Sequence, residues 1–145
     1  MIRLVTVTPD NWRTKLAVSS EQTEFVADRL CLLARACAYR EQRSRPFFIY
    51  HDDLPVGMAL YYDCDEVEAY NFSQLFIDER YQGNGFGSEA AKQILGMMER
   101  DGKYDKVVLC FIEGNDAAER MYEKLGFYLT GERDENEIIM EKRLR

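Results

Sequence analysis

The sequence has little proline and a single histidine, and these shortages exclude several classes of protein. It has three prolines in 145 residues, with 46% apolar and 31% charged residues, and this is not the composition of a disordered chain. His51 and four cysteines without a CxxC pair provide no Cys/His zinc site, so we expect no metal. The length and apolar content predict one domain, residues 1–145, with a core of its own.

Long hydrophobic runs and an excess of positive charge are also missing. No apolar run approaches membrane-spanning length and the N-terminus has no signal sequence, so we expect a cytoplasmic protein that does not bind membranes. Nineteen basic and 26 acidic residues give a net charge of −7, which argues against nucleic acid and favours small cationic partners. Cys31, Cys37, Cys64 and Cys110 are expected to be free, buried thiols, and Cys110 to be inert.

The periodicity of apolar residues predicts an α/β chain. The expected order is strand, two helices, three strands, helix, strand, helix and a final hairpin. The expected strands are residues 2–8, 47–51, 56–62, 69–77 and 106–112, with hairpin strands at 127–130 and 138–143; the expected helices are a short one from Thr8, one from Ser19 or Ser20 to about residue 39, one from Gly87 to Asp101 and one from Asn115 to Lys124.

Three alternating glycines separate the strand 69–77 from the following helix. They are Gly83, Gly85 and Gly87, and they permit backbone conformations that are closed to other residues. A loop that opens into a helix leaves N–H groups unpaired at the positive end of the helix dipole, which suits a phosphate. The pattern favours an anion site, or else a tight turn that needs only flexibility. It is not a dinucleotide fingerprint, and no Walker lysine-serine pair follows it.

A second pattern lies on the helix 115–124. On an ideal helix Asn115, Ala118 and Tyr122 fall within about 60° of one another, so an amide, a methyl and a phenol share one face. Asn115 is either a helix cap or a ligand contact. Tyr122 is either a core aromatic or a residue that faces a ligand.

Together the two segments resemble the GNAT superfamily of acyl-CoA-dependent N-acyltransferases. The order of elements is similar along essentially the whole chain, and the stretches 76–83 and 111–116 look like bacterial spermine/spermidine (diamine) N-acetyltransferases. The resemblance implies an α/β (α+β) fold with a central mixed, mostly antiparallel twisted sheet flanked by helices. Splayed central strands would form the acetyl-CoA cleft. The motifs that carry the resemblance are Gln82-x-x-Gly85-x-Gly87 and Asn115-x-x-Ala118-x-x-x-Tyr122-x-x-x-Gly126-Phe127.

The resemblance also implies roles for residues, with acetyl-CoA as co-substrate. Tyr122 would protonate the departing thiolate, and Asn115 and Ala118 would contact the coenzyme. The resemblance to the family, together with the exposed aromatics near the C-terminal hairpin, suggests a homodimer. The main chain of Leu75, Phe76 and Ile77 would bond the pantetheine arm, and the pyrophosphate would be held by backbone N–H groups of Gln82, Gly83, Asn84, Gly85, Phe86, Gly87 and Ser88.

The acceptor amine must be neutral to attack a thioester. Freeing its lone pair at pH 7 costs roughly 4–5 kcal/mol when its pKa is near 10.4, and a carboxylate can offset part of that. Glu66 and Glu68 are the candidates for this base. Candidates for holding a distal ammonium are Asp63 and Asp65, joined by Glu21, Glu24 and Asp28 on one helix face. Alternatively, each of these acids is simply a solvated charge on the protein surface.

The expected function is acetyl transfer to a primary amine, with a polyamine such as spermidine or spermine as the small-molecule acceptor. Two alternatives stay open. A protein N-terminus or lysine would suit an acidic cleft as well, and a non-catalytic acetyl-CoA-binding sensor or interaction module would use the same loop. Tyr122 favours a catalyst, because binding alone does not need a phenol near the sulfur.

Overall fold

A computed structural model describes residues 1–17 and 28–145 of the chain. Its helices are α1 (Arg29–Ala38), α2 (Phe86–Asp101) and α3 (Asp116–Lys124). Its strands are β1 (Ile2–Thr6), β2 (Arg45–His51), β3 (Leu54–Cys64), β4 (Ala69–Ile77), β5 (Lys106–Ile112), β6 (Tyr128–Asp134) and β7 (Glu137–Arg143).

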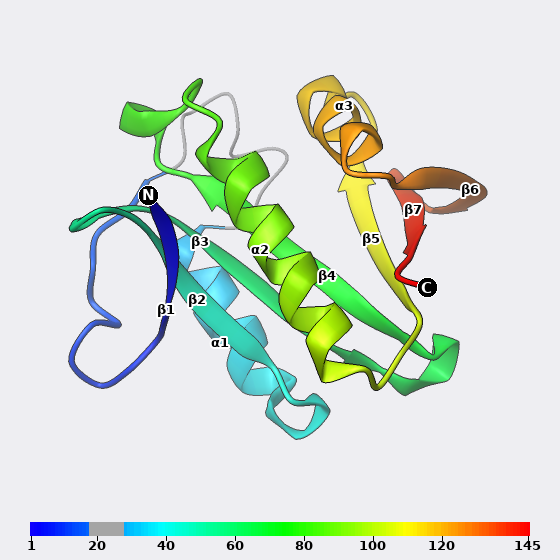
Figure 1. The fold of residues 1–145 in the computed structure, drawn as a ribbon, viewed down its shortest axis with the longest axis horizontal. Coiled ribbons are helices and arrows are strands. Elements are labelled where there is room, and N and C mark those ends of the chain that lie inside the picture. Colours follow the sequence, from blue (N-terminus) through cyan, green and yellow to red (C-terminus); the bar gives the residue numbers. More distant parts are fainter. Residues whose placement is uncertain (18–27) are drawn as a thin grey trace.

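The seven strands of the described chain form one twisted sheet in the order β1-β2-β3-β4-β5-β7-β6 (Figure 1). Every neighbouring pair is antiparallel except β4 and β5, which are parallel. The predicted mixed, mostly antiparallel sheet flanked by helices is therefore confirmed.

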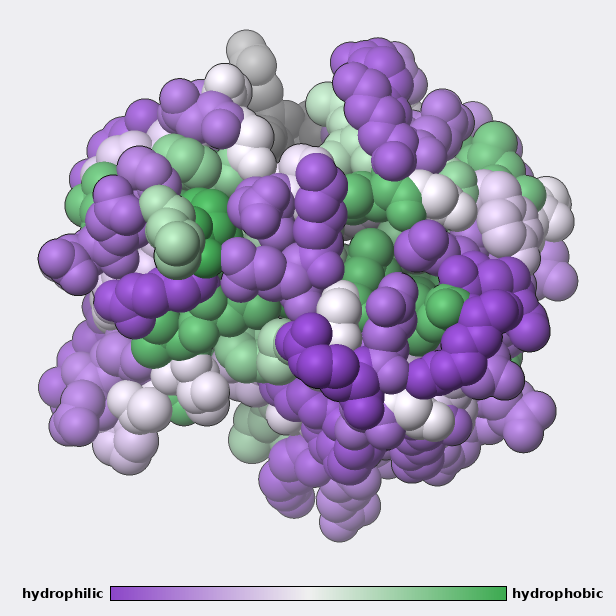
Figure 2. Space-filling view, in the orientation of Figure 1, coloured by the Kyte–Doolittle hydropathy of each residue, from purple (hydrophilic) through white to green (hydrophobic). Residues whose placement is uncertain are grey.

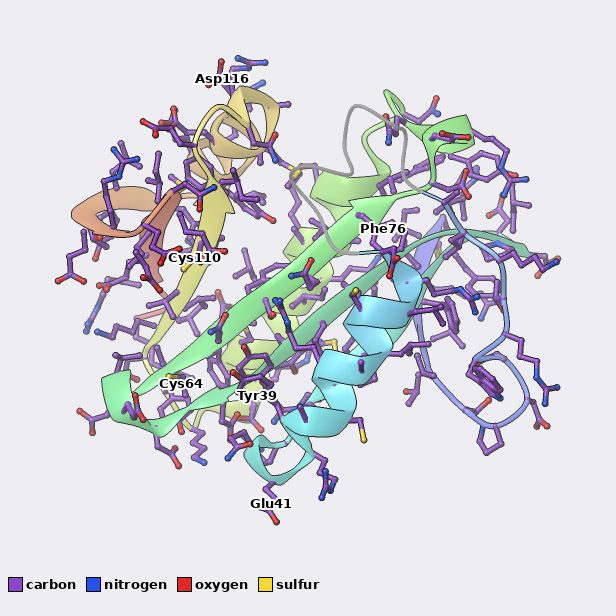
Figure 3. All side chains as sticks on the ribbon, turned by 180° about the vertical axis from the view of Figure 1, so that it is seen from behind. Tyr39, Glu41, Cys64, Phe76, Cys110 and Asp116 are labelled. Carbon is purple, nitrogen blue, oxygen red and sulfur yellow. The ribbon has the colours of Figure 1, made fainter. Side chains whose placement is uncertain are left out.

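Helices cover both faces of the sheet, α2 on the face seen in Figure 1 and α1 on the face seen in Figure 3. On α2 the buried residues recur at helical spacing, from Ala90 through Ile94 to Met98, and face the larger core cluster. The helix ends at Gly102, which has φ 74° and donates its N–H to the Met98 carbonyl. On α1, Leu32 and Ala36 are buried against a second cluster that includes Phe48 and Met58.

The parallel pair β4–β5 is joined at only two positions, Tyr70 with Val107 and Asn71 with Val108. By contrast β4 pairs with β3 along its whole length, with a bulge that leaves Ser73 without a partner on β3. Beyond Asn71 the two central strands diverge, as Figure 1 shows, and the predicted splay is present. This divergence positions the site.

The early helices differ from the prediction. No helix starts at Thr8; residues 9–13 form turns, in which Asn11 accepts the N–H of Thr8 through its side chain at 2.7 Å. These side-chain bonds compete with the helix ladder. Helix α1 begins at Arg29 with Asp28 as its N-cap, whereas Ser19 and Ser20 lie outside the described residues.

Candidate active site

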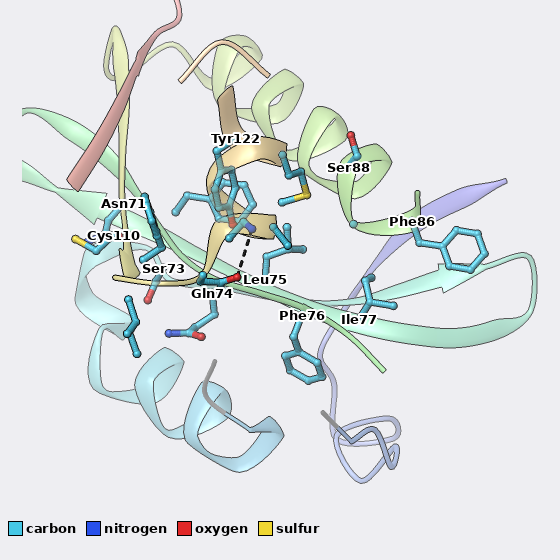
Figure 4. Close-up of a pocket in the computed structure, with 18 of the residues that line it drawn as sticks. Asn71, Ser73, Gln74, Leu75, Phe76, Ile77, Phe86, Ser88, Cys110 and Tyr122 are labelled. Atoms are coloured by element: carbon cyan, nitrogen blue, oxygen red, sulfur yellow. Dashed lines mark hydrogen bonds between the residues drawn. The ribbon is translucent and has the colours of Figure 1, made fainter. Parts of the chain in front are cut away.

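The splayed strands border a cavity of about 1080 Å³. Most lining residues come from β4 between Asn71 and Ile77, the end of β5, the glycine loop and one face of α3. The others come from the C-terminal part of α1, from β3 and from the β6–β7 hairpin. Figure 4 shows residues of β4 and Tyr122 around this space, and in Figure 2 hydrophobic side chains reach a largely hydrophilic surface between α2 and α3.

The glycine loop leads into α2 through an uncapped first turn. Gly83 and Gly85 have φ of 81° and 77°, and a Cβ at either position would meet no atom within 4 Å, so the need for glycine is conformational. Gly85 is the N-cap and no side chain caps the turn. The N–H groups of Phe86, Gly87 and Ser88 have no partner within the helix and lie at its positive end, at the cavity wall. This geometry is that of an anion site.

Side chains of the loop and of the residues before it hold it in place. The Gln82 amide donates to the Ile77 carbonyl at 3.0 Å, and the Asn84 amide donates to the Tyr81 carbonyl at 2.9 Å. The buried Asp78 accepts the N–H of Ala17 and the guanidinium of Arg80, at 2.9 Å from Nε and 3.0 Å from Nη2. Arg80 is therefore engaged by Asp78.

We expect Asp78→Asn to destabilise the fold by about 2 kcal/mol at neutral pH. The Arg80 hydrogen bonds lower the pKa of Asp78 from 3.8 to about 2. A carboxylate with a lowered folded-state pKa contributes stability above its unfolded-state pKa, and this contribution is lost as the pH falls through about 2. Urea unfolding of wild type and variant should differ by a constant amount above about pH 5 and converge towards pH 2. A difference that does not depend on pH would contradict the assignment.

Tyr122 lies on α3 with its side chain buried against Phe72 and Phe127, whose ring centroids are 6.2 Å and 5.5 Å away. It also lines the cavity. Burial raises the pKa of the Tyr122 phenol above its usual value, so the group carries its proton throughout the neutral range. The protonated phenol therefore borders the cavity.

Asn115 and Ala118 line the cavity beside Tyr122, as the helical spacing predicted. Asn115 is the N-cap of α3, and its Oδ1 accepts the N–H of Ala118 at 3.3 Å. The cap reading of Asn115 is thus confirmed. Asn115 also lines the cavity, so its side-chain amide lies at the cavity edge.

The cysteines differ from the prediction. All four are free, but Cys31, Cys37 and Cys110 are exposed. On β5 the buried side chains are those of Val107, Leu109 and Phe111. Because side chains alternate between the two faces of a strand, Cys110 lies on the opposite face and lines the cavity. The apolar run of β5 suggested burial on both faces, which the splay prevents. Partial burial, with the charges of Glu137 and Asp134, raises the pKa of the Cys110 thiol.

Most of the acids proposed for the acceptor lie elsewhere. Asp63 is buried on β3 and makes ion pairs with Arg43 at 2.6 Å, Lys103 at 2.9 Å and Arg45 at 3.4 Å. Burial acts to raise its pKa, but the hydrogen bonds from Arg43 and Lys103 outweigh burial and lower it. Asp65 accepts the hydroxyl of Tyr104. The structure uses both acids in an ion-pair network away from the cavity.

Glu66 and Glu68 are also outside the cavity lining. They lie in and just after a short 3₁₀ turn, Asp65–Val67, at the opposite end of β4 from the glycine loop (Figure 1). Asp28 accepts the N–H of Cys31 at 2.8 Å as the cap of α1, and these bonds lower its pKa. Glu21 and Glu24 lie outside the described residues.

Sequence reasoning missed Asp134 and Glu137. They pair with each other at the tip of the β6–β7 hairpin, and they are the carboxylates among the described residues that line the cavity. Their backbones belong to the sheet, but neither side-chain carboxylate makes a hydrogen bond or an ion pair with another described residue. Both lie in the charged stretch between the two predicted hairpin strands, 127–130 and 138–143, and no local signal distinguishes them from their neighbours.

Comparison with known proteins agrees with this geometry. Residues 7–127 match the Acetyltransferase (GNAT) family. The chain is 33% identical to the spermine/spermidine N(1)-acetyltransferase of Bacillus subtilis (strain 168), over 99% of both chains. The chain belongs to the GNAT acetyltransferase family. As a GNAT N-acetyltransferase it has acetyl-CoA as its co-substrate.

Solved structures share the GNAT fold at lower identity. The spermidine N-acetyltransferase of Vibrio cholerae, in complex with CoA and spermine, has a TM-score of 0.79 at 16% identity and covers 99% of this chain and 95% of its own. The PaiA N-acetyltransferase of Thermoplasma acidophilum, in complex with coenzyme A, has a TM-score of 0.74 at 15% identity over 99% of both chains. No helix in residues 1–17 and 28–145 is long and apolar enough to cross a membrane.

Proposed function

We propose that this GNAT acetyltransferase transfers the acetyl group of acetyl-CoA to a primary amine of a polyamine such as spermidine or spermine. The observation that carries the proposal is one cavity that joins the amides of the α2 N-terminus, the Tyr122 phenol and two carboxylates without ion pairs. The 33% identical Bacillus subtilis relative, named a spermine/spermidine N(1)-acetyltransferase, supports the choice of acceptor.

The reaction needs no covalent enzyme intermediate. The neutral amine nitrogen attacks the thioester carbonyl carbon, and the C–S bond breaks as the acetyl group moves to nitrogen. Tyr122 donates its proton to the departing thiolate, and the nitrogen loses one proton to solvent or to a carboxylate. The amides of Phe86, Gly87 and Ser88 hold the diphosphate. The Leu75–Ile77 main chain, which does not pair with β5, bonds the pantetheine arm.

Asp134 and Glu137 provide the negative charge that an acceptor with several ammonium groups requires. Two carboxylates that face each other across a hairpin repel, and they are unpaired among the described residues. A cationic acceptor relieves this repulsion. They replace Asp63 and Asp65 as candidates for the distal ammonium, and Glu66 and Glu68 as candidates for receiving the proton.

We expect Asp134→Asn and Glu137→Gln each to raise KM for spermidine about three- to tenfold, because an exposed charge contributes on the order of 1 kcal/mol to binding a nearby cation. KM for acetyl-CoA should not change. Initial rates at low and high salt measure the effect, which salt should reduce. Glu132→Gln is the matched control, since Glu132 lies on the same hairpin but does not line the cavity. An equal rise in the control would contradict a local role.

Thiol release from acetyl-CoA with a panel of amines tests the proposed function as a whole. Spermidine and spermine should be acetylated faster than putrescine, lysine peptides and aminoglycosides. Faster acetylation of lysine peptides or free protein N-termini would favour the protein-acetyltransferase alternative. Binding of acetyl-CoA without turnover of any acceptor would favour a sensor or interaction module. The homodimer remains a prediction, and a measurement of the molecular mass in solution would test it.

A further inference from the structure

The only histidine of the sequence, His51, lies against the glycine loop and has no role in the proposed mechanism. The His51 ring stacks on Phe86, with ring centroids 4.5 Å apart and planes at 25°. His51 ends β2 and pairs with both Ile2 and Leu54, so the strands on either side hold it. Its Nε2 is 3.9 Å from Oδ2 of Asp52, a carboxylate that also binds the N-terminal ammonium at 2.8 Å.

Phe86 is the anchor of the glycine loop. Residues 82–85 are exposed, whereas Phe86 is half-buried and packs against the larger core cluster. In Figure 4 its ring points away from Tyr122. Phe86 is also the first residue of α2, and its own N–H is one of the amides of the anion site. No side chain caps this turn, so the contacts on the two sides of the Phe86 ring hold the start of α2 together with the Gln82 and Asn84 hydrogen bonds.

We propose that His51 is a positioning residue for coenzyme binding: its ring closes over Phe86 and holds the first turn of α2 in the orientation that grips the diphosphate. His51 does not line the cavity, so it acts through Phe86 and touches no substrate. The inference rests on the proposed coenzyme site. It adds to that site a contact from β2, which β3 separates from β4 in the sheet.

His51→Ala should raise KM for acetyl-CoA and the calorimetric Kd for coenzyme A by roughly two- to tenfold, the range of an aromatic stacking contact. The value of kcat at saturating acetyl-CoA should stay within about twofold of wild type, since the reacting groups are untouched. His51→Phe, which keeps a flat ring on Phe86, should restore both constants. Combined with Phe86→Leu, the His51→Ala change should have no further effect.

Tyr50→Leu is the matched control. Tyr50 precedes His51 on β2 and packs against the cluster on the α1 face, so its loss should leave Kd for coenzyme A unchanged. Equal Kd for wild type and His51→Ala, or failure of His51→Phe to restore binding, would overturn the inference. If wild type itself binds no coenzyme A, the proposed coenzyme site fails instead, and the two failures are distinguished by the wild-type titration.

Discussion

Tyr122→Phe is expected to lower kcat by about 10²- to 10⁴-fold while acetyl-CoA still binds, the range for loss of a general acid. The substitution keeps the ring that packs against Phe72 and Phe127, so only the hydroxyl is lost. Without its proton the thiolate must leave as an anion into a buried space, which is costly. In the wild type, burial raises the pKa of Tyr122, so kcat should not fall between pH 7 and about 9.5 through loss of this proton.

The measurement is single-turnover thiol release beside a calorimetric titration with coenzyme A. Tyr128→Phe is the control, because the Tyr128 hydroxyl bonds Glu141 on the exposed β6–β7 surface and is remote from the chemistry. A Tyr122→Phe variant with full kcat would remove the proposed acid. Such a result, with coenzyme A binding intact, would leave solvent as the proton donor.

Gly85→Asp is expected to raise KM for acetyl-CoA by about 30- to 100-fold, the equivalent of one lost charge-assisted hydrogen bond plus repulsion. Aspartate tolerates the left-handed conformation that Gly85 adopts, and no atom lies within 4 Å of its Cβ position. The fold should persist. The new carboxylate would cap the first turn of α2 and so occupy the amides that the diphosphate needs.

Gly131→Asp provides a control, because it also places an aspartate in a left-handed backbone conformation. Gly131 has φ 86° and, like Gly85, open space around its Cβ position, but it lies on β6 and does not line the cavity. Thermal unfolding of both variants separates loss of fold from loss of binding. If both substitutions changed KM for acetyl-CoA equally, or if neither did, the glycine loop would not be the diphosphate site.

Much of the site could be predicted from local sequence. Gly83 and Gly85 have the positive φ that their spacing suggested, and β4 and β5 have the predicted bounds. The face shared by Asn115, Ala118 and Tyr122 follows from helix geometry alone, because these residues lie within two turns of one helix. Backbone preference and helical periodicity are short-range properties, so the sequence expresses them directly.

The acids could not be assigned in this way. Asp63 and Glu68 look equally suited to an acceptor, yet Asp63 makes ion pairs with Arg43, Arg45 and Lys103, residues 18 to 40 positions away. Glu68 lies at the far end of β4 from the glycine loop. Asp134 and Glu137 reach the cavity only because β7 pairs with β5 and carries the hairpin to the edge of the opening.

The sequence by itself determined the order of strands and helices from residue 45 onward, the glycine turn and the phenol, because each depends on residues close together in the chain. The tertiary structure decided which charges meet the cavity, that Cys110 faces it, and that His51 covers Phe86. These contacts join residues that are distant in sequence. Their partners are set by strand order and by the two-residue limit of β4–β5 pairing, which no local pattern encodes.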